Sequence, residues 1–306
     1  MIISASRRTD IPAYYCDWFF NRIKERYVLV RNPINIHRIS RINLSPDAVD
    51  CIVFWTKNPK PMLERLNELE DYSFYFQFTL NSYGKDVEAN LPSKNDYLIG
   101  IFKSLSDKIG PDKVIWRYDP IFLSRKYTMD YHIEHFGELT RQLKGYTKKC
   151  TISFMDFYPG IKRNIKELEI FGISFAQERQ VAEKLSKIAF ENGLKMDTCA
   201  EKIDLIDLGI AHAKCIDDEL ISKISGSHIR AGKDKNQRLE CRCVSSIDIG
   251  AYDTCRNGCR YCYANHNMNM LYKNVENYDA DSPLLCSRIG SDDAVNERNV
   301  KSFKEK

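Results

Sequence analysis

The chain has 306 residues, 43% of them hydrophobic, which is enough for one large barrel or two modest domains. Its 46 basic and 42 acidic residues leave a formal net charge of +4, so charge alone neither requires nor excludes a nucleic-acid partner. The start, MIISASRRTD, lacks the apolar core of a signal peptide, and no apolar run approaches the roughly 20 residues of a membrane helix. We therefore expect a soluble, cytoplasmic protein without a membrane partner.

Short apolar runs alternate with amphipathic stretches along the chain. The runs predict strands over Ile2–Ala5, Tyr27–Val30, Cys51–Trp55, Phe74–Thr79, Val114–Arg117, Cys150–Phe154, Leu194–Asp197 and Ser246–Ile249. Apolar residues spaced by three and four predict helices over Asp17–Arg26, Pro61–Leu69, Asp96–Lys108, Met129–Leu143 and Ala176–Asn192. This alternation indicates an α/β fold with a parallel sheet, most simply a full or partial (β/α) barrel of the TIM type.

Polar residues gather directly after several predicted strands. Because the carboxyl ends of parallel strands share one rim, where active sites gather, these residues are site candidates. Lys57, Arg117 and Asp119 are the candidate catalytic residues, as anchors of a cofactor or substrate. An internal ion pair at the rim is an equally good interpretation. Asp156 and Glu201 are weaker candidates of the same kind.

A dense cysteine motif stands near the C-terminal end, in the run CRNGCRYCYAN. Cys255, Cys259 and Cys262 can grip one face of an iron–sulfur cluster, because soft thiolates suit iron and the glycine lets the loop curl. A 4Fe–4S cube needs four ligands, so three cysteines leave one iron open. The alternative is a zinc site, although zinc usually takes four protein ligands in two separated pairs.

Four more cysteines precede this loop. Together they could hold a second iron–sulfur cluster or a structural zinc, and a metal would stabilise a segment that otherwise looks rich in loops. The alternative is that they are scattered buried thiols, as free cysteines often are. These four candidate ligands are Cys199, Cys215, Cys241 and Cys243. The other cysteines fall in or near apolar patterns and are expected in the core.

The three-cysteine spacing, with tyrosine before the last cysteine, resembles the cluster loop of the radical S-adenosylmethionine enzymes. The resemblance implies that the open iron of a 4Fe–4S cluster binds S-adenosylmethionine. It further implies that a reductant such as flavodoxin or ferredoxin supplies one electron, and that a 5′-deoxyadenosyl radical then abstracts hydrogen from a substrate. In that family the loop lies near the N-terminus, whereas here it comes last.

Several strand ends resemble, in order, those of one branch of these enzymes, the spore photoproduct lyase-like group. They are Thr9-Asp10, Thr56-Lys57, Phe78-Thr79-Leu80 and Arg117-Tyr118-Asp119-Pro120-Ile121. A circular permutation explains the displaced loop, with Ser246–Ile249 as the first barrel strand and Ile2–Ala5 as the second, since domain termini often lie close together. The resemblance hints at a nucleic-acid base as substrate, but a peptide or a small metabolite fits the sequence as well.

The Gly-Gly-Glu motif with which that family binds its cofactor is absent. The resemblance instead places at the cofactor a polar cluster whose hydroxyl and carboxylate could accept from an ammonium, and whose arginine could hold a carboxylate. The alternative is a solvated loop that caps the next helix. The candidate cofactor-binding residues are Arg7, Arg8, Thr9, Asp10, Tyr261 and Asn265.

The whole chain is also similar to a bacterial family described as a domain of unknown function, DUF1848, through ISASRRTDIP, FWTKNP and CxxxCxYCYAN. We expect the main part of the barrel over 1–198 and a cysteine-containing, loop-rich insertion over 199–244. The last strand, the cluster loop and a helix should follow over 245–280, then a polar tail over 281–306 with mobile residues beyond Arg288.

Two other classes of protein stay open. One is a non-catalytic iron–sulfur or zinc protein that acts as a redox sensor or binding module. The other is a metal-dependent barrel hydrolase of nucleic acid or phosphoesters, which would need several His, Asp and Glu ligands on strand ends. The six histidines show no ligand spacing, and we expect His132 and His135 on a helix surface. Trp55 and Trp116 are expected to fill the core.

Overall fold

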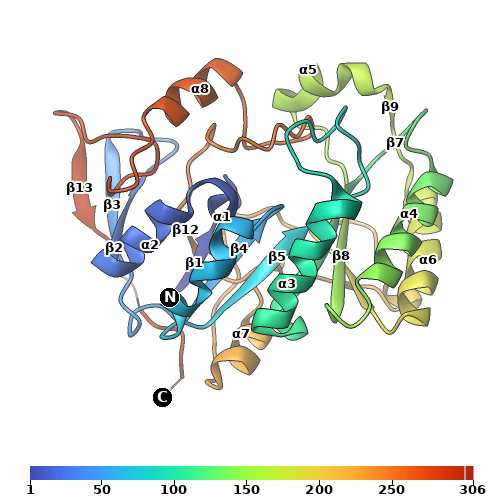
Figure 1. Cartoon of the computed structure of the whole chain (residues 1–306), viewed down its shortest axis with the longest axis horizontal. Coiled ribbons are helices and arrows are strands. Elements are labelled where there is room, and N and C mark those ends of the chain that lie inside the picture. Colours follow the sequence, from blue (N-terminus) through green and yellow to red (C-terminus); the bar gives the residue numbers. More distant parts are fainter. Residues whose placement is uncertain (300, 306) are drawn as a thin grey trace.

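The computed structural model describes residues 1–299 and 301–305 and has a mixed α/β architecture (Figure 1). Eight parallel strands form one sheet in the order β11-β10-β8-β6-β5-β4-β1-β12. In chain order they are β1 (Ile2–Ala5), β4 (Cys51–Thr56), β5 (Phe74–Thr79), β6 (Val114–Ile121), β8 (Lys149–Phe154), β10 (Lys195–Thr198), β11 (Ala211–His212) and β12 (Ile247–Asp248). The parallel α/β prediction is therefore confirmed.

The sheet is open, because no pairing among the described residues joins its two edge strands, β11 and β12. A closed barrel is thus not what the structure has. The sheet order nevertheless puts β12, from the end of the chain, beside β1, with Ile3 opposite Ile247 in parallel register. The strand that precedes the cysteine loop therefore neighbours the first strand of the chain.

The helices are α1 (Ile11–Tyr14), α2 (Cys16–Glu25), α3 (Ile99–Ile109), α4 (Met129–Gln142), α5 (Lys162–Ile165), α6 (Phe175–Glu191), α7 (Asp218–Ser225) and α8 (Met268–Glu276). Side-chain caps start the longer ones: Thr128 caps α4, and Ser174 with Gln177 forms a capping box on α6. The helix predicted from Pro61 is a 3-10 helix, Lys60–Leu69, and α3 begins later than predicted, after a π-helical turn over Lys94–Leu98.

Successive residues of the central strands point to opposite faces of the sheet, so two cores form. Ile3, Phe54 and Phe76 belong to the larger core, to which α2, α3, α4 and α6 also contribute. Ile2 and Val53 face the other side, in a smaller core with α7 and the 199–244 segment. That segment also supplies β11, an edge strand of the main sheet.

Two peripheral segments form a second sheet. The strand predicted at Tyr27–Val30 is confirmed as β2 (Tyr27–Arg31), but it pairs antiparallel with β3 (Arg38–Asn43) and not with the main sheet. Beyond Arg288, where mobile residues were predicted, the structure has a strand, β13 (Ala294–Glu297), which pairs in parallel with β3. A further two-stranded sheet joins β7 (Leu123–Ser124) and β9 (Ile170–Phe171).

The two ends of the chain meet at one buried carboxylate. Asp50 accepts from the Met1 ammonium at 2.6 Å, from the Ser302 hydroxyl at 2.5 Å and from the Phe303 amide at 2.8 Å. Figure 1 shows both termini on the same side of the molecule. Among the described residues, no helix is both long enough and apolar enough to cross a membrane.

Candidate metal and cofactor site

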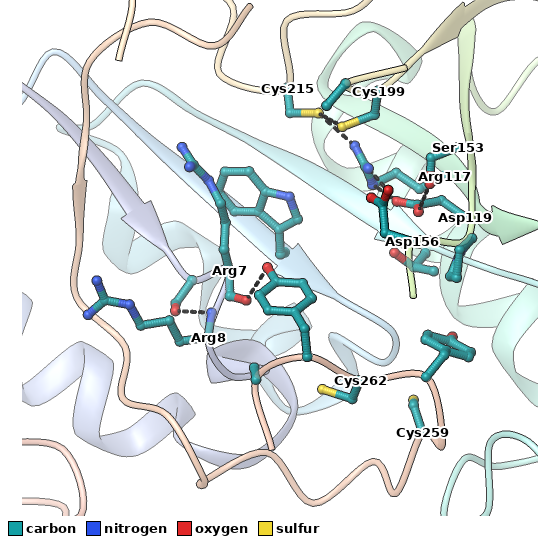
Figure 2. A pocket seen from close by; sticks show the side chains of 18 of the residues that line it. Arg7, Arg8, Arg117, Asp119, Ser153, Asp156, Cys199, Cys215, Cys259 and Cys262 are labelled. Carbon is teal, nitrogen blue, oxygen red and sulfur yellow. Dashed lines mark hydrogen bonds and ion pairs between the residues drawn. The ribbon is translucent and has the colours of Figure 1, made fainter. Parts of the chain in front are cut away.

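One cavity of about 430 Å³ opens at the carboxyl ends of the parallel strands. All the predicted site residues line it except Asn265 and the weaker candidate Glu201. Figure 2 shows Cys199 and Cys215 beside Arg117 on one wall, and Cys259 and Cys262 across the cavity. Residues from both ends of the chain and from its middle therefore meet at one place.

The close approach of β12 to β1 positions the start of the cysteine loop. Asp248, at the end of β12, accepts from the hydroxyls of Ser4 and Ser6, each at 2.7 Å, and from the Arg7 amide at 2.8 Å. A side chain at Gly250 would place its Cβ 2.0 Å from the Ser6 oxygen, so this position requires glycine.

The cysteine loop is held by backbone hydrogen bonds to the segment after β5. Glu88 and Cys259 form an antiparallel bridge, and the Arg260 amide donates to the Val87 carbonyl at 2.9 Å. Gly258, between the first two loop cysteines, has a φ of +68°, and a Cβ there would lie 2.9 Å from the Asn90 side chain. The glycine therefore permits both the turn and the close contact.

A buried network of charged and phenolic groups lies beneath the loop. The Lys57 ammonium donates to Glu88 and to the Tyr261 hydroxyl, both at 2.8 Å, and Lys94 donates to the other Glu88 oxygen at 2.6 Å. Burial would raise the pKa of Glu88, but the two ammonium groups outweigh it and lower the pKa to about 2. Lys57 is thus paired within the protein, at a position where its charge also acts on Cys259.

Asp10 is used chiefly to assemble the site. Its carboxylate accepts from the Thr56 hydroxyl at 2.7 Å, from the Lys57 amide at 2.8 Å and from the Asn257 amide group at 3.1 Å. It also caps α1, as the alternative interpretation of this cluster predicted. Thr9 differs, because its buried hydroxyl has no hydrogen-bond partner among the described residues and is available to a ligand.

Two more candidate cofactor contacts lie beside the loop. Arg7 stacks over Trp55 at 5.4 Å, and its buried Nε has no partner among the described residues. Arg8 instead points to the backbone of Gly250. Asn265 lies outside the cavity lining and donates to the Cys255 carbonyl at 2.7 Å, so it stabilises the loop.

Arg117 and Asp119 form an internal ion pair, which is the alternative that the sequence offered to a role in binding cofactor or substrate. Arg117 Nε donates to Asp119 at 2.8 Å, and the Ser153 hydroxyl donates to the other carboxylate oxygen. Burial raises the pKa of Asp119, but Arg117 outweighs this and the pKa lies below its usual value. Contact of this pair with a substrate stays a prediction.

Cys255 is buried, whereas Cys259 and Cys262 are half-buried. Loss of contact with solvent raises the pKa of Cys255 to about 12 and the pKa of Cys259 well above its usual value. Binding a metal must therefore displace protons, and the Lys57 charge favours the Cys259 thiolate. Within residues 1–299 and 301–305, no group of three or more His, Cys, Asp or Glu side chains is arranged to hold a single metal ion. Ligands of a cubane need no common centre, since each binds a different iron.

The other four cysteines meet on the opposite wall. The sulfurs of Cys199 and Cys215 are 3.2 Å apart, and Arg117 Nη1 donates to Cys215 at 2.9 Å. A hydrogen bond with Cys215 lowers the pKa of Cys243, but the hydrogen bond with Cys241 and burial outweigh it and raise the pKa to about 11. The hydrogen bond with Cys243 lowers the pKa of Cys241 to about 7.

Several residues at or near the site were not predicted. Glu88 accepts hydrogen bonds from Lys57 and Tyr261. It does not directly follow a predicted strand, so the sequence did not mark it as a site candidate. Trp55, predicted in the core, packs partly buried against the smaller core and also lines the cavity. Arg238 lines the cavity and pairs with Asp156. His132, predicted at the surface, is fully buried, with Nδ1 at 2.8 Å from the Tyr118 hydroxyl.

Residues 2–264 match the model of one protein family, described as Domain of unknown function (DUF1848). The match covers most of the chain, so the protein belongs to the DUF1848 family. It includes β12 and all three cysteines of the loop. No curated protein matches the sequence.

Proposed function

We propose that this protein is a radical S-adenosylmethionine enzyme that holds a 4Fe–4S cluster through Cys255, Cys259 and Cys262. The observation that carries the proposal is the position of this loop at the carboxyl end of a strand beside β1, facing one cavity. The meeting of the chain termini at Asp50 supports the idea that the fold is a circularly permuted, partial barrel.

The residues present fit this cofactor in three respects. The cavity wall supplies soft thiols for iron. The unpartnered Thr9 hydroxyl and Arg7 Nε are buried polar atoms available to the methionyl group of S-adenosylmethionine. Lys57, the nearest buried cation, favours a thiolate at Cys259.

The protein's own part is to orient and to exclude water. The Glu88 network and the 84–91 backbone fix the loop, while Arg7 and Thr9 would bind the charged methionyl end of the cofactor. When bound, the cluster supplies one electron, delivered by a reductant such as flavodoxin or ferredoxin, for cleavage of S-adenosylmethionine, so that hydrogen abstraction from the substrate yields 5′-deoxyadenosine.

The test is formation of 5′-deoxyadenosine by anaerobically reconstituted protein with a strong reductant. Wild type should form it, and Cys259→Ala should lose at least about 100-fold in rate. Cys16→Ala, a buried cysteine of α2 that does not line the cavity, is the matched control and should keep the rate. Equal formation by wild type and Cys259→Ala would overturn the proposal.

A further inference from the structure

The four cysteines opposite the cluster loop form one contiguous group of thiols. Cys215, Cys241 and Cys243 are buried in the smaller core and Cys199 packs against it, with the sulfurs of Cys199 and Cys215 3.2 Å apart. They come from three separate segments: the end of β10, the turn before α7 and the loop before β12. Bringing four thiols together from three segments requires a common cause beyond the burial that single free cysteines show.

The distance between sulfurs distinguishes two kinds of metal centre. With Zn–S bonds of about 2.3 Å, sulfurs on one tetrahedral ion lie about 3.8 Å apart. In a cubane each thiolate binds a different iron, so the sulfurs stand farther apart. The 3.2 Å between Cys199 and Cys215 is close to the separation for a shared ion and too short for two corners of a cube.

Charge also favours a thiolate site here. One divalent ion with four thiolates has a net charge of −2, which a buried site must balance. Arg117 donates directly to the Cys215 sulfur at 2.9 Å, and Arg7 lies close enough for the charges of Cys243 and Cys215 to act on it. Two guanidinium groups therefore flank the thiols and offset part of that charge, since Arg117 also pairs with Asp119.

We propose that Cys199, Cys215, Cys241 and Cys243 bind one zinc ion as a closed, tetrahedral, structural site. Among the described residues no three ligand side chains surround a common point, so the thiols must reorient when the ion binds. The ion would fix the 199–244 segment to the smaller core and so build one wall of the cavity. This site is independent of the proposed cofactor chemistry.

The experiment measures metal content in a variant without the cluster loop ligands, Cys255→Ala/Cys259→Ala/Cys262→Ala, expressed with both iron and zinc supplied. We expect about one zinc per chain, with no acid-labile sulfide. Adding Cys241→Ala/Cys243→Ala should reduce zinc at least about tenfold, while adding Cys16→Ala should leave it unchanged. No zinc in the triple variant, or iron with sulfide in its place, would overturn the proposal.

A second measurement avoids dependence on a variant that fails to fold. Co²⁺ added to the metal-depleted triple variant should give thiolate-to-cobalt charge-transfer bands and the visible bands of tetrahedral cobalt, and a single Cys241→Ser change should weaken them. Absence of these bands would contradict the site. The two proposals can fail separately. If the triple variant binds zinc but the wild type does not cleave S-adenosylmethionine, the proposed function is wrong and the zinc site is still supported.

Discussion

The seven cysteines of the cavity fall into two groups that the fold treats differently. Cys255, Cys259 and Cys262 lie in one short loop, and no hydrogen bond joins their sulfurs among the described contacts. The four thiols on the opposite wall come from distant segments and pack at the smaller core, with the sulfurs of Cys199 and Cys215 3.2 Å apart. Separate loop thiols suit a cluster with several metal atoms, whereas closely packed thiols suit a single ion.

The two groups are also held by different forces. Backbone hydrogen bonds and the Lys57–Glu88–Lys94 network fix the loop, whereas apolar packing against the smaller core positions the four thiols. Damage to either support should therefore affect one group and spare the other.

The largest expected effect separates the groups by activity. Cys262→Ala removes a proposed cluster ligand and should lower 5′-deoxyadenosine formation at least about 100-fold. Cys241→Ala removes a proposed zinc ligand on the other wall and should lower it by less than about tenfold, through movement of the wall. Rate measurements on both variants check this, and equal losses would show that the two groups act as one site.

Glu88→Gln tests the support of the loop. The change leaves Lys57 and Lys94 as buried, uncompensated cations, so the free energy of unfolding should fall by about 3 kcal/mol. Denaturant unfolding of metal-free protein measures this. Zinc content should be unaffected, whereas iron per chain should decrease. Glu183→Gln, which removes an exposed ion pair of α6, is the control and should change stability by less than about 1 kcal/mol.

The scaffold that both groups share should depend on pH through His132. Burial lowers its pKa to about 4 in the folded protein, against about 6.5 when unfolded. Folding favours the neutral imidazole. The contribution of His132 to the free energy of unfolding is therefore fully present above about pH 6.5 and is lost as the pH falls toward 4. The loss should reach about 2 kcal/mol by pH 5. Metal-free His132→Asn protein should lack this component, and identical pH profiles for variant and wild type would refute it.

The smallest effect concerns the turn of the loop. Gly258→Ala forces a side chain into a positive φ and against Asn90, at a cost of about 1–2 kcal/mol. Iron retention after reconstitution should fall while zinc stays constant. Gly172→Ala is the matched control, because it has open space and no positive φ. Equal iron retention in the two variants would show that the loop can adopt another backbone conformation and still bind iron.

The sequence predicts those parts of the molecule whose signals are local. The strand periodicity predicts seven of the main-sheet strands to within a few residues, and the spacing of Cys255, Cys259 and Cys262 identifies the loop. The sequence did not predict which strands pair in the second sheet. The antiparallel pairing of β2 with β3 depends on tertiary packing, and the pairing of β13 with β3 depends on a partner far along the chain. The approach of Cys199 to Cys215 likewise depends on how two loops meet at the end of the sheet.

The electron spin resonance spectrum of reduced, reconstituted protein, recorded with and without S-adenosylmethionine, tests the central claim most directly. An open iron in a three-cysteine cluster predicts a 4Fe–4S signal in wild type that changes shape when S-adenosylmethionine is added. A signal unaltered by saturating S-adenosylmethionine, or the same signal in the Cys255→Ala/Cys259→Ala/Cys262→Ala variant, would contradict the account.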